Sequence, residues 1–200
     1  PRSLSLSIYQ YLITNAAWRI ARARIGYHHP EPASLMVTIA GHPLIDVRLS
    51  MNNLLPDTLS DLLKEKLINH YIERMKQNRE MHDKIEFEIC FTCLDFDFEF
   101  QSQRLLDNRF SPEEVAELKQ ALLVLTDRIV NGKVEPLEKL MEEIAFLEKR
   151  RRVVMEAPYD SEGIPLLISQ LLDDCVQYGT IPFSILARYG FVAYSLLRSL

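Results

Sequence analysis

Apolar residues recur at spacings of three and four along much of the chain, which is the periodicity of helices with one buried face. The stretches that show it are residues 4–27, 57–76, 111–130, 137–155, 166–178 and 181–200. Residues 111–114 (SPEE) have the form of a capping box with proline in the first turn, and residues 56–58 (PDT) give a second start signal. We expect helices over all these stretches, with the highly charged residues 137–155 as a long helix that leads outward.

Shorter runs in the first half of the chain are rich in strand-forming residues. Residues 35–40 and 44–49 lie on either side of Gly41-His42-Pro43, so they predict a hairpin. Residues 85–91 alternate apolar with polar side chains and then become continuously apolar, as a strand does when it passes from the rim of a sheet to its centre. The predicted fold class is therefore α+β, predominantly helical with a small antiparallel sheet in the N-terminal half.

The chain has 200 residues, which is enough for one sizeable core without disulfides or metals. We expect a single domain, with a subdivision into an α+β part over residues 1–108 and an all-helical part over residues 109–200. The chain does not begin with Met, and its last helical pattern runs to Leu200 without a cap, so we expect a piece of a larger multidomain protein. It has no uncharged run of about 18 residues, so no membrane span is predicted.

Composition excludes several classes of protein. A chain with 48% hydrophobic and 26% charged residues buries enough surface to fold, so it is not intrinsically disordered. A net charge of −5 argues against sequence-independent binding to nucleic acid, which needs a basic face. The three cysteines do not make a disulfide framework of the secreted type, so the expected location is the cytoplasm.

Cys90 and Cys93 have the C-x-x-C spacing of redox dithiols and of half a zinc site. A redox pair lies at a helix N-terminus, whereas these residues lie in or at the end of a predicted strand. A zinc site needs a second pair of ligands, and Cys175 has no adjacent histidine. We therefore favour buried structural thiols, predict no metal site, and interpret His28 and His29 as solvated loop residues.

One candidate site lies on the strand predicted over residues 85–91. Glu86 and Glu88 share one face of that strand, roughly 7 Å apart, with His82 nearby. Such a group can hold a cation or perform acid–base chemistry. The wet face of an edge strand explains the same pattern and is the interpretation that we favour.

A second candidate site lies on the strand predicted over residues 44–49. Asp46, Arg48 and Ser50 share one face, and Asn52 and Asn53 follow at the strand exit. An arginine fork among amides and hydroxyls suits a carboxylate or phosphate held through two hydrogen bonds. An ordinary solvated face with an Asx turn explains the pattern equally well.

Arginines cluster at two places. They are Arg2, Arg19, Arg22 and Arg24 near the first helix, and residues 150–152. Either cluster could meet phosphate groups, but solvated helix faces explain them more simply.

The sequence contains no phosphate-binding glycine loop, zinc-protease motif or nucleophile elbow, so by itself it has no self-contained catalytic signature.

Four segments occur in an order that is found in one group of proteins. They are SLSIYQYLIT (residues 5–14), IDVRLSMN (45–52), HDKIEFEI (82–89) and YGTIPFSILAR (178–188). With them the chain resembles, over nearly its whole length, the central region of large bacterial proteins related to phosphoenolpyruvate synthase. This group includes the glutamine kinases of capsule phosphoramidate synthesis.

The resemblance implies an ATP-grasp-like nucleotide-binding domain before this region and a mobile phosphohistidine domain after it. It also implies a relay, in which ATP or the ATP/phosphoenolpyruvate couple phosphorylates the histidine, which then delivers the phosphoryl group at a second site. This chain would be the acceptor-binding or scaffold domain between them, with an amino acid or carboxylic acid as acceptor. ATP and Mg²⁺ would be needed only by the whole protein. The alternative is a non-catalytic helical linker or protein-interaction domain.

The matched segments also imply substrate-binding residues. These are Asp46, Arg48, Asn52, Glu86, Glu88 and Arg188. They would hold the acceptor or contact the mobile domain, and none has an assigned catalytic role. An arginine beside amides suits phosphoryl transfer, which depends mainly on positioning and electrostatic stabilisation. The parent protein is expected to be an enzyme, and this region alone to be inactive, with no cofactor, nucleic acid or membrane bound to it.

Overall fold

The structure is a computed structural model in which residues 5–29, 34–158 and 163–200 are described. In chain order its elements are α1 (Leu6–Tyr9), η1 (Gln10–Ile20), α2 (Ala21–Arg24), β1 (Met36–Ile39), β2 (His42–Ile45), α3 (Val47–Asn52), α4 (Asp61–Gln77), η2 (Arg79–Met81), η3 (Ile85–Ile89), α5 (Phe98–Leu106), α6 (Pro112–Val130), α7 (Leu137–Glu156), α8 (Ile164–Cys175), η4 (Val176–Thr180) and α9 (Ile181–Ser199). Most of the chain is helical and β1 pairs with β2 in one antiparallel hairpin, so the predicted α+β class is confirmed.

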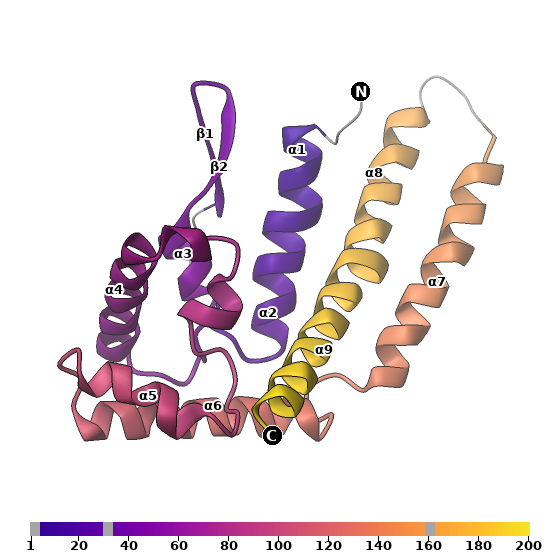
Figure 1. Cartoon of the computed structure of the whole chain (residues 1–200). Helices are drawn as coiled ribbons and strands as arrows, with labels where there is room; N and C mark the ends of the chain where they lie inside the picture. The colour runs from indigo at the N-terminus through magenta and orange to yellow at the C-terminus, as the bar shows by residue number, and fades with distance from the viewer. Residues whose placement is uncertain (1–4, 30–33, 159–162) are drawn as a thin grey trace.

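Figure 1 shows α6 lying across the base of the molecule, with the other long helices in two groups above it. On one side the rod formed by α1, η1 and α2 packs beside α9, and α7 packs against α8 and α9. On the other side α3 packs on α4, and the hairpin projects beyond them. α7 is the long helix expected over residues 137–155: it leads away from α6, and α8 then returns alongside it.

Two clusters of buried side chains stabilise these groups. The first lies among α3, α4, α5 and the start of α6, and it includes Leu67, Leu118 and Leu122. The second lies among α2, the end of α6, α7 and α9, and it includes Leu125 and Ile185. Because α6 contributes leucines to both clusters, it joins the two groups of helices.

The second strand of the hairpin is shorter than predicted. Ala40 and Gly41 form the turn between the strands, and their φ angles of 50° and 81° are those of a type I′ turn. The side chain of Asp46 then accepts a hydrogen bond from the Leu49 backbone N–H at 3.0 Å, which makes Asp46 the N-cap of α3. The strand face expected over residues 46–50 is therefore wrong, because this cap starts a helix where the strand was expected to continue.

The strand predicted over residues 85–91 is also wrong. Its first five residues form the π-helical turn η3, and the structure places no strand beside them in the ranges that it describes. The backbone is held by a side chain instead, because Arg104 donates to the carbonyl oxygen of Ile89 at 3.1 Å. Glu86 and Glu88 therefore project from a turn and do not share a strand face.

Helix starts follow local capping. The capping box at Ser111 is confirmed, with hydrogen bonds in both directions between Ser111 and Glu114. The start predicted at residues 56–58 is wrong, because the N-cap of α4 is Ser60, whose side chain accepts from the Leu63 N–H at 3.4 Å. Both serines are visible in the sequence, but only Ser111 is followed three residues later by the glutamate that completes a capping box.

The two helices predicted at the C-terminal end are one continuous helix, in which the π-helical turn η4 joins α8 to α9. Pro182 has no N–H for the helical ladder, and a widened turn directly before it relieves the mismatch. This 36-residue helix, Ile164–Ser199, is long and apolar enough to cross a membrane by length and composition alone, with 28% of its apolar window buried. Core helices of soluble proteins meet the same criterion.

Candidate functional site

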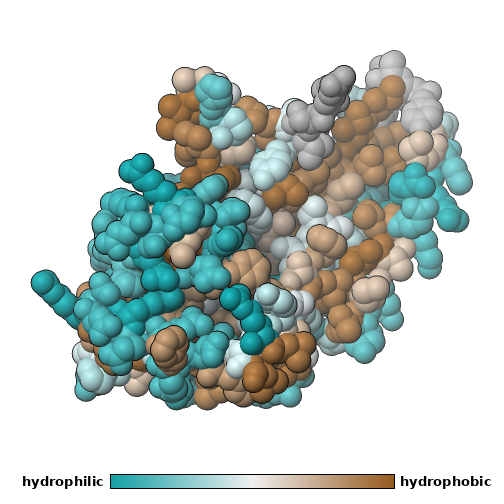
Figure 2. All heavy atoms as spheres, in the orientation of Figure 1, coloured by the Kyte–Doolittle hydropathy of each residue, from teal (hydrophilic) through white to brown (hydrophobic). Residues whose placement is uncertain are grey.

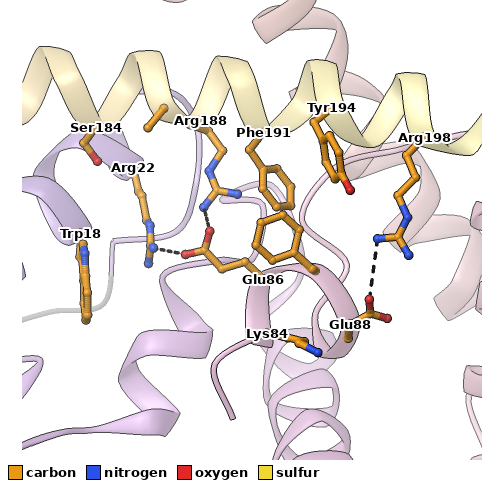
Figure 3. Close-up of a pocket in the computed structure, with 12 residues that line it drawn as sticks. Trp18, Arg22, Lys84, Glu86, Glu88, Ser184, Arg188, Phe191, Tyr194 and Arg198 are labelled. Atoms are coloured by element: carbon orange, nitrogen blue, oxygen red, sulfur yellow. Dashed lines mark hydrogen bonds and ion pairs between the residues drawn. The ribbon is translucent and has the colours of Figure 1, made fainter. Parts of the chain in front are cut away.

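A cavity of about 850 Å³ opens between the first helical rod, η3 and α9 (Figure 3). Trp18 and Arg22 line it from the rod, and Lys84 and residues 86–88 line it from the η3 region. On α9 the lining residues Arg188 and Phe191 are three positions apart, which places them on one side of the helix. Segments far apart in the sequence therefore build one site.

Glu86 holds two arginine side chains in the wall of this cavity. Its Oε2 accepts a hydrogen bond from Arg188 Nη2 at 2.6 Å, and its Oε1 accepts one from Arg22 Nη2. Arg22 is 8% exposed and Arg188 is 5% exposed. Arg22 also donates to Asn53 Oδ1 at 3.4 Å. Together Arg22, Glu86 and Arg188, the arginine–glutamate triad, carry one net positive charge that is largely shielded from water.

Burial and charge oppose each other within the arginine–glutamate triad. Burial lowers the pKa of Arg22 to about 10, against the attraction of Glu86. Burial acts to raise the pKa of Glu86, but the guanidiniums of Arg188 and Arg22 outweigh it and hold that pKa below its usual value. Burial acts to lower the pKa of Arg188, whereas Tyr27 and Glu86 raise it above its usual value. All three members are therefore charged at neutral pH.

Arg188 keeps one donor without an acceptor. Its guanidinium stacks on Tyr27 and Phe191, with Cζ 5.2 Å and 4.6 Å from the two ring centroids. Its Nη1 is buried and has no hydrogen-bond partner in the part of the chain that the structure describes. A buried donor left in this state costs about 1–3 kcal/mol, and more when it is charged. Arg188 lines the cavity, so an anionic group of a ligand that reached this nitrogen would supply the missing acceptor.

Further charges lie toward solvent. Arg198 and Glu88 approach to 3.7 Å, and Lys84 is exposed (Figure 3). Four cationic and two anionic side chains line the cavity, an excess of two positive charges. The whole chain carries a net charge of −5. The cavity is therefore a locally cationic site on an acidic protein, which favours an anionic ligand.

The structure brings together half of the predicted binding residues. Glu86, Glu88 and Arg188 line the cavity. The others lie at α3 and do not line it: Asp46 caps the helix and Asn52 is its last residue. Arg48 is exposed and donates to Asn69 Oδ1 at 2.8 Å. The predicted arginine fork on a strand does not form, because these residues are helical.

Arg22, Lys84 and Arg198 also line the site, as do the aromatic residues Trp18, Phe87, Phe191 and Tyr194, and the sequence did not single them out as site residues. The sequence places Arg22 in a cluster interpreted as solvated, yet its spacing of four from Trp18 was a signal that the two share one helix face.

Most of the other described members of the basic clusters have acidic partners, whereas Arg19 contacts His29 Nε2 at 3.5 Å. Arg24 pairs with Glu135, and Arg150 pairs with Asp174 at 2.9 Å. Arg2 lies outside the described residues.

The cysteines form no site. Cys90 and Cys93 are free and buried, as predicted. Burial raises the pKa of both thiols, to about 11 for Cys93. Within residues 5–29, 34–158 and 163–200, no group of three or more His, Cys, Asp and Glu side chains is placed to hold a metal ion.

Comparison of the chain with protein-family models, with curated proteins and with solved structures found no match in any of the three.

Proposed function

We propose that this chain is the central acceptor-binding and scaffold domain of an ATP-dependent phosphotransferase related to phosphoenolpyruvate synthase. In that protein a phosphohistidine carries the phosphoryl group from ATP, with Mg²⁺, to the acceptor. The ATP-grasp-like and phosphohistidine domains lie outside this chain, which is inactive alone and works in the cytoplasm. The acceptor, an amino acid or carboxylic acid, occupies the cavity beside the arginine–glutamate triad.

One observation carries this proposal: a cavity with an excess of two positive charges on a chain of net charge −5, in which the buried Arg188 Nη1 has no acceptor among the described residues. Guanidinium groups hold carboxylates with defined geometry. Since phosphoryl transfer depends mainly on positioning and charge stabilisation, a cationic cavity suits the acceptor's role. The resemblance of the four sequence segments supplies the reaction class.

Calorimetric titration of the chain with pyruvate and glutamine tests the acceptor site. We expect Lys84→Gln to weaken binding about tenfold, because it removes an exposed charge from the cavity without disturbing buried groups. Arg48→Ala is the matched control, since Arg48 is exposed and lies outside the cavity, and it should leave the affinity unchanged. Absence of binding across the panel, or equal losses in both variants, contradicts the proposal.

A second candidate function, a protein-interaction or linker domain, is favoured by exposed apolar side chains on the long C-terminal helix. Leu166, Phe183 and Leu197 are 73%, 68% and 72% exposed. Figure 2 shows apolar side chains gathered over the α8–α9 side and hydrophilic ones over the α4 side. Size-exclusion chromatography with light scattering distinguishes the candidates, because an interaction domain associates through this helix and Leu166→Ser with Leu197→Ser prevents it.

A further inference from the structure

We propose that the ligand of the cavity is an aromatic monocarboxylate, whose ring stacks on Phe87 and Tyr194 while its carboxylate meets the arginine–glutamate triad. This inference rests on the proposed function, because it names the substrate class of the same acceptor site.

Aromatic side chains form a wall of the cavity beside the charges. The rings of Phe87 and Phe191 lie 4.6 Å apart at 49°, and those of Phe87 and Tyr194 lie 6.5 Å apart at 84°. Figure 3 shows Phe191 and Tyr194 extending from α9 beside the triad. Phe87 is 50% exposed and Tyr194 is 53% exposed, so ring surface remains free inside the cavity. A ligand ring can extend this series of tilted and edge-to-face contacts.

The net charge of the arginine–glutamate triad, which lies beside this wall, balances the charge of one carboxylate. The triad carries one net positive charge, and within the described ranges Arg188 Nη1 has no acceptor. A polyphosphate is usually cradled by backbone N–H groups of glycine-rich loops, and no glycine lines the cavity among the described residues. A carboxylate therefore fits the available donors better than a nucleotide does.

The size of the cavity supports a ligand larger than a three-carbon acid. Pockets of about 300–1,000 Å³ take drug-sized ligands, and this one measures about 850 Å³. Pyruvate would reach the charges but leave the aromatic wall uncovered. A carboxylate that carries an aromatic ring covers both parts of the cavity.

Calorimetry of the 200-residue chain with 3-phenylpropionate, 3-cyclohexylpropionate and 3-phenylpropanamide tests the class. The cyclohexyl acid is the more apolar, so simple hydrophobic burial favours it, whereas ring stacking favours the phenyl acid by about two- to tenfold. The uncharged amide should bind about tenfold more weakly than the phenyl acid. Trp18, the only tryptophan, lines the cavity, so its fluorescence should report the same dissociation constant.

Phe87→Leu should abolish the preference for phenyl over cyclohexyl and keep the preference for acid over amide. Phe183→Leu, an exposed phenylalanine of α9 outside the cavity, is the matched control and should keep both preferences. Three results would overturn the proposal that the ligand is an aromatic monocarboxylate. They are binding of the cyclohexyl acid that equals or exceeds binding of the phenyl acid, an unchanged preference for phenyl in Phe87→Leu, and tighter binding of AMP than of the phenyl acid. If pyruvate or glutamine still binds through Lys84, the proposed function survives any of these results, whereas failure of every acid overturns both.

Discussion

Glu86 is the only carboxylate that contacts both buried arginines among the described ion pairs, so the local charge balance depends on it. Glu86→Gln keeps the shape of the side chain and removes its charge, which leaves Arg22 and Arg188 facing each other without a counterion. Because unpaired buried charges are costly, we expect the free energy of unfolding to fall by about 3 kcal/mol. Urea denaturation followed by circular dichroism measures this change.

The control for this substitution is Glu88→Gln, at the fourth residue of the same turn. Glu88 lies 3.7 Å from Arg198, whose side chain is 58% exposed. Exposed ion pairs contribute about 0–1 kcal/mol, so this variant should be nearly as stable as the unsubstituted 200-residue chain. Equal losses in the two variants would show that the turn itself, and not the buried charge, is sensitive to substitution.

His70 gives the stability of the chain a dependence on pH. Burial, together with the nearby Arg104 and Arg74, lowers the pKa of His70 to about 4 from 6.5. Between these values the unfolded chain binds the proton more strongly, so this contribution to stability falls as the pH drops from about 6.5 toward 4. In His70→Phe, which keeps a ring against Phe110, the melting temperature should fall less between pH 7 and 5. Parallel curves for the two proteins would contradict this assignment.

Substitution of two glycines by alanine tests two different effects on stability, helix propensity at Gly190 and backbone conformation at Gly26. Gly190 lies within α9, and an added Cβ meets nothing within 4 Å, so Gly190→Ala should stabilise the chain by about 0.5–1 kcal/mol. Gly26 ends the first helical rod with a φ of 105°, and an added Cβ lies 3.0 Å from Arg128 Nη1. Gly26→Ala should therefore destabilise it by about 2 kcal/mol. Thermal denaturation measures both, and changes of the same sign would refute the argument.

At the level of elements, the long helices could be predicted because their apolar periodicity extends over several turns. The short elements around residues 46 and 86 could not. Residues 45–49 alternate apolar with polar side chains, a pattern that is typical of a strand. They become helical from Val47 onward because the Asp46 side chain caps the first turn. Residues 85–91 have the composition of a strand, but no described strand lies beside them to pair with. Whether a second strand lies close enough to pair with a segment depends on the tertiary fold. The local sequence of residues 85–91 therefore does not reveal that such a strand is missing among the described residues.

At the level of the whole molecule, the candidate site was only partly predictable for a related reason. Its central contacts join residues 22, 86 and 188, which come from three separate elements. The sequence singled out Glu86 and Arg188 through the matched segments, but in isolation Arg22 resembles any arginine on a helix face. What distinguishes it is burial against η3 and α9, which only the assembled fold determines.

Whether the chain behaves as one domain depends on α6. Leu122 belongs to the first buried cluster and Leu125 to the second, and they are 0% and 2% exposed. If α6 couples the clusters, Leu122→Ala and Leu125→Ala should each lower the free energy of unfolding by about 2–5 kcal/mol. Each should also shift the transitions seen by circular dichroism and by Trp18 fluorescence together, since one cooperative unit has one midpoint. A Trp18 transition that stays in place in Leu122→Ala while the dichroism transition moves would instead mean that the two clusters unfold separately.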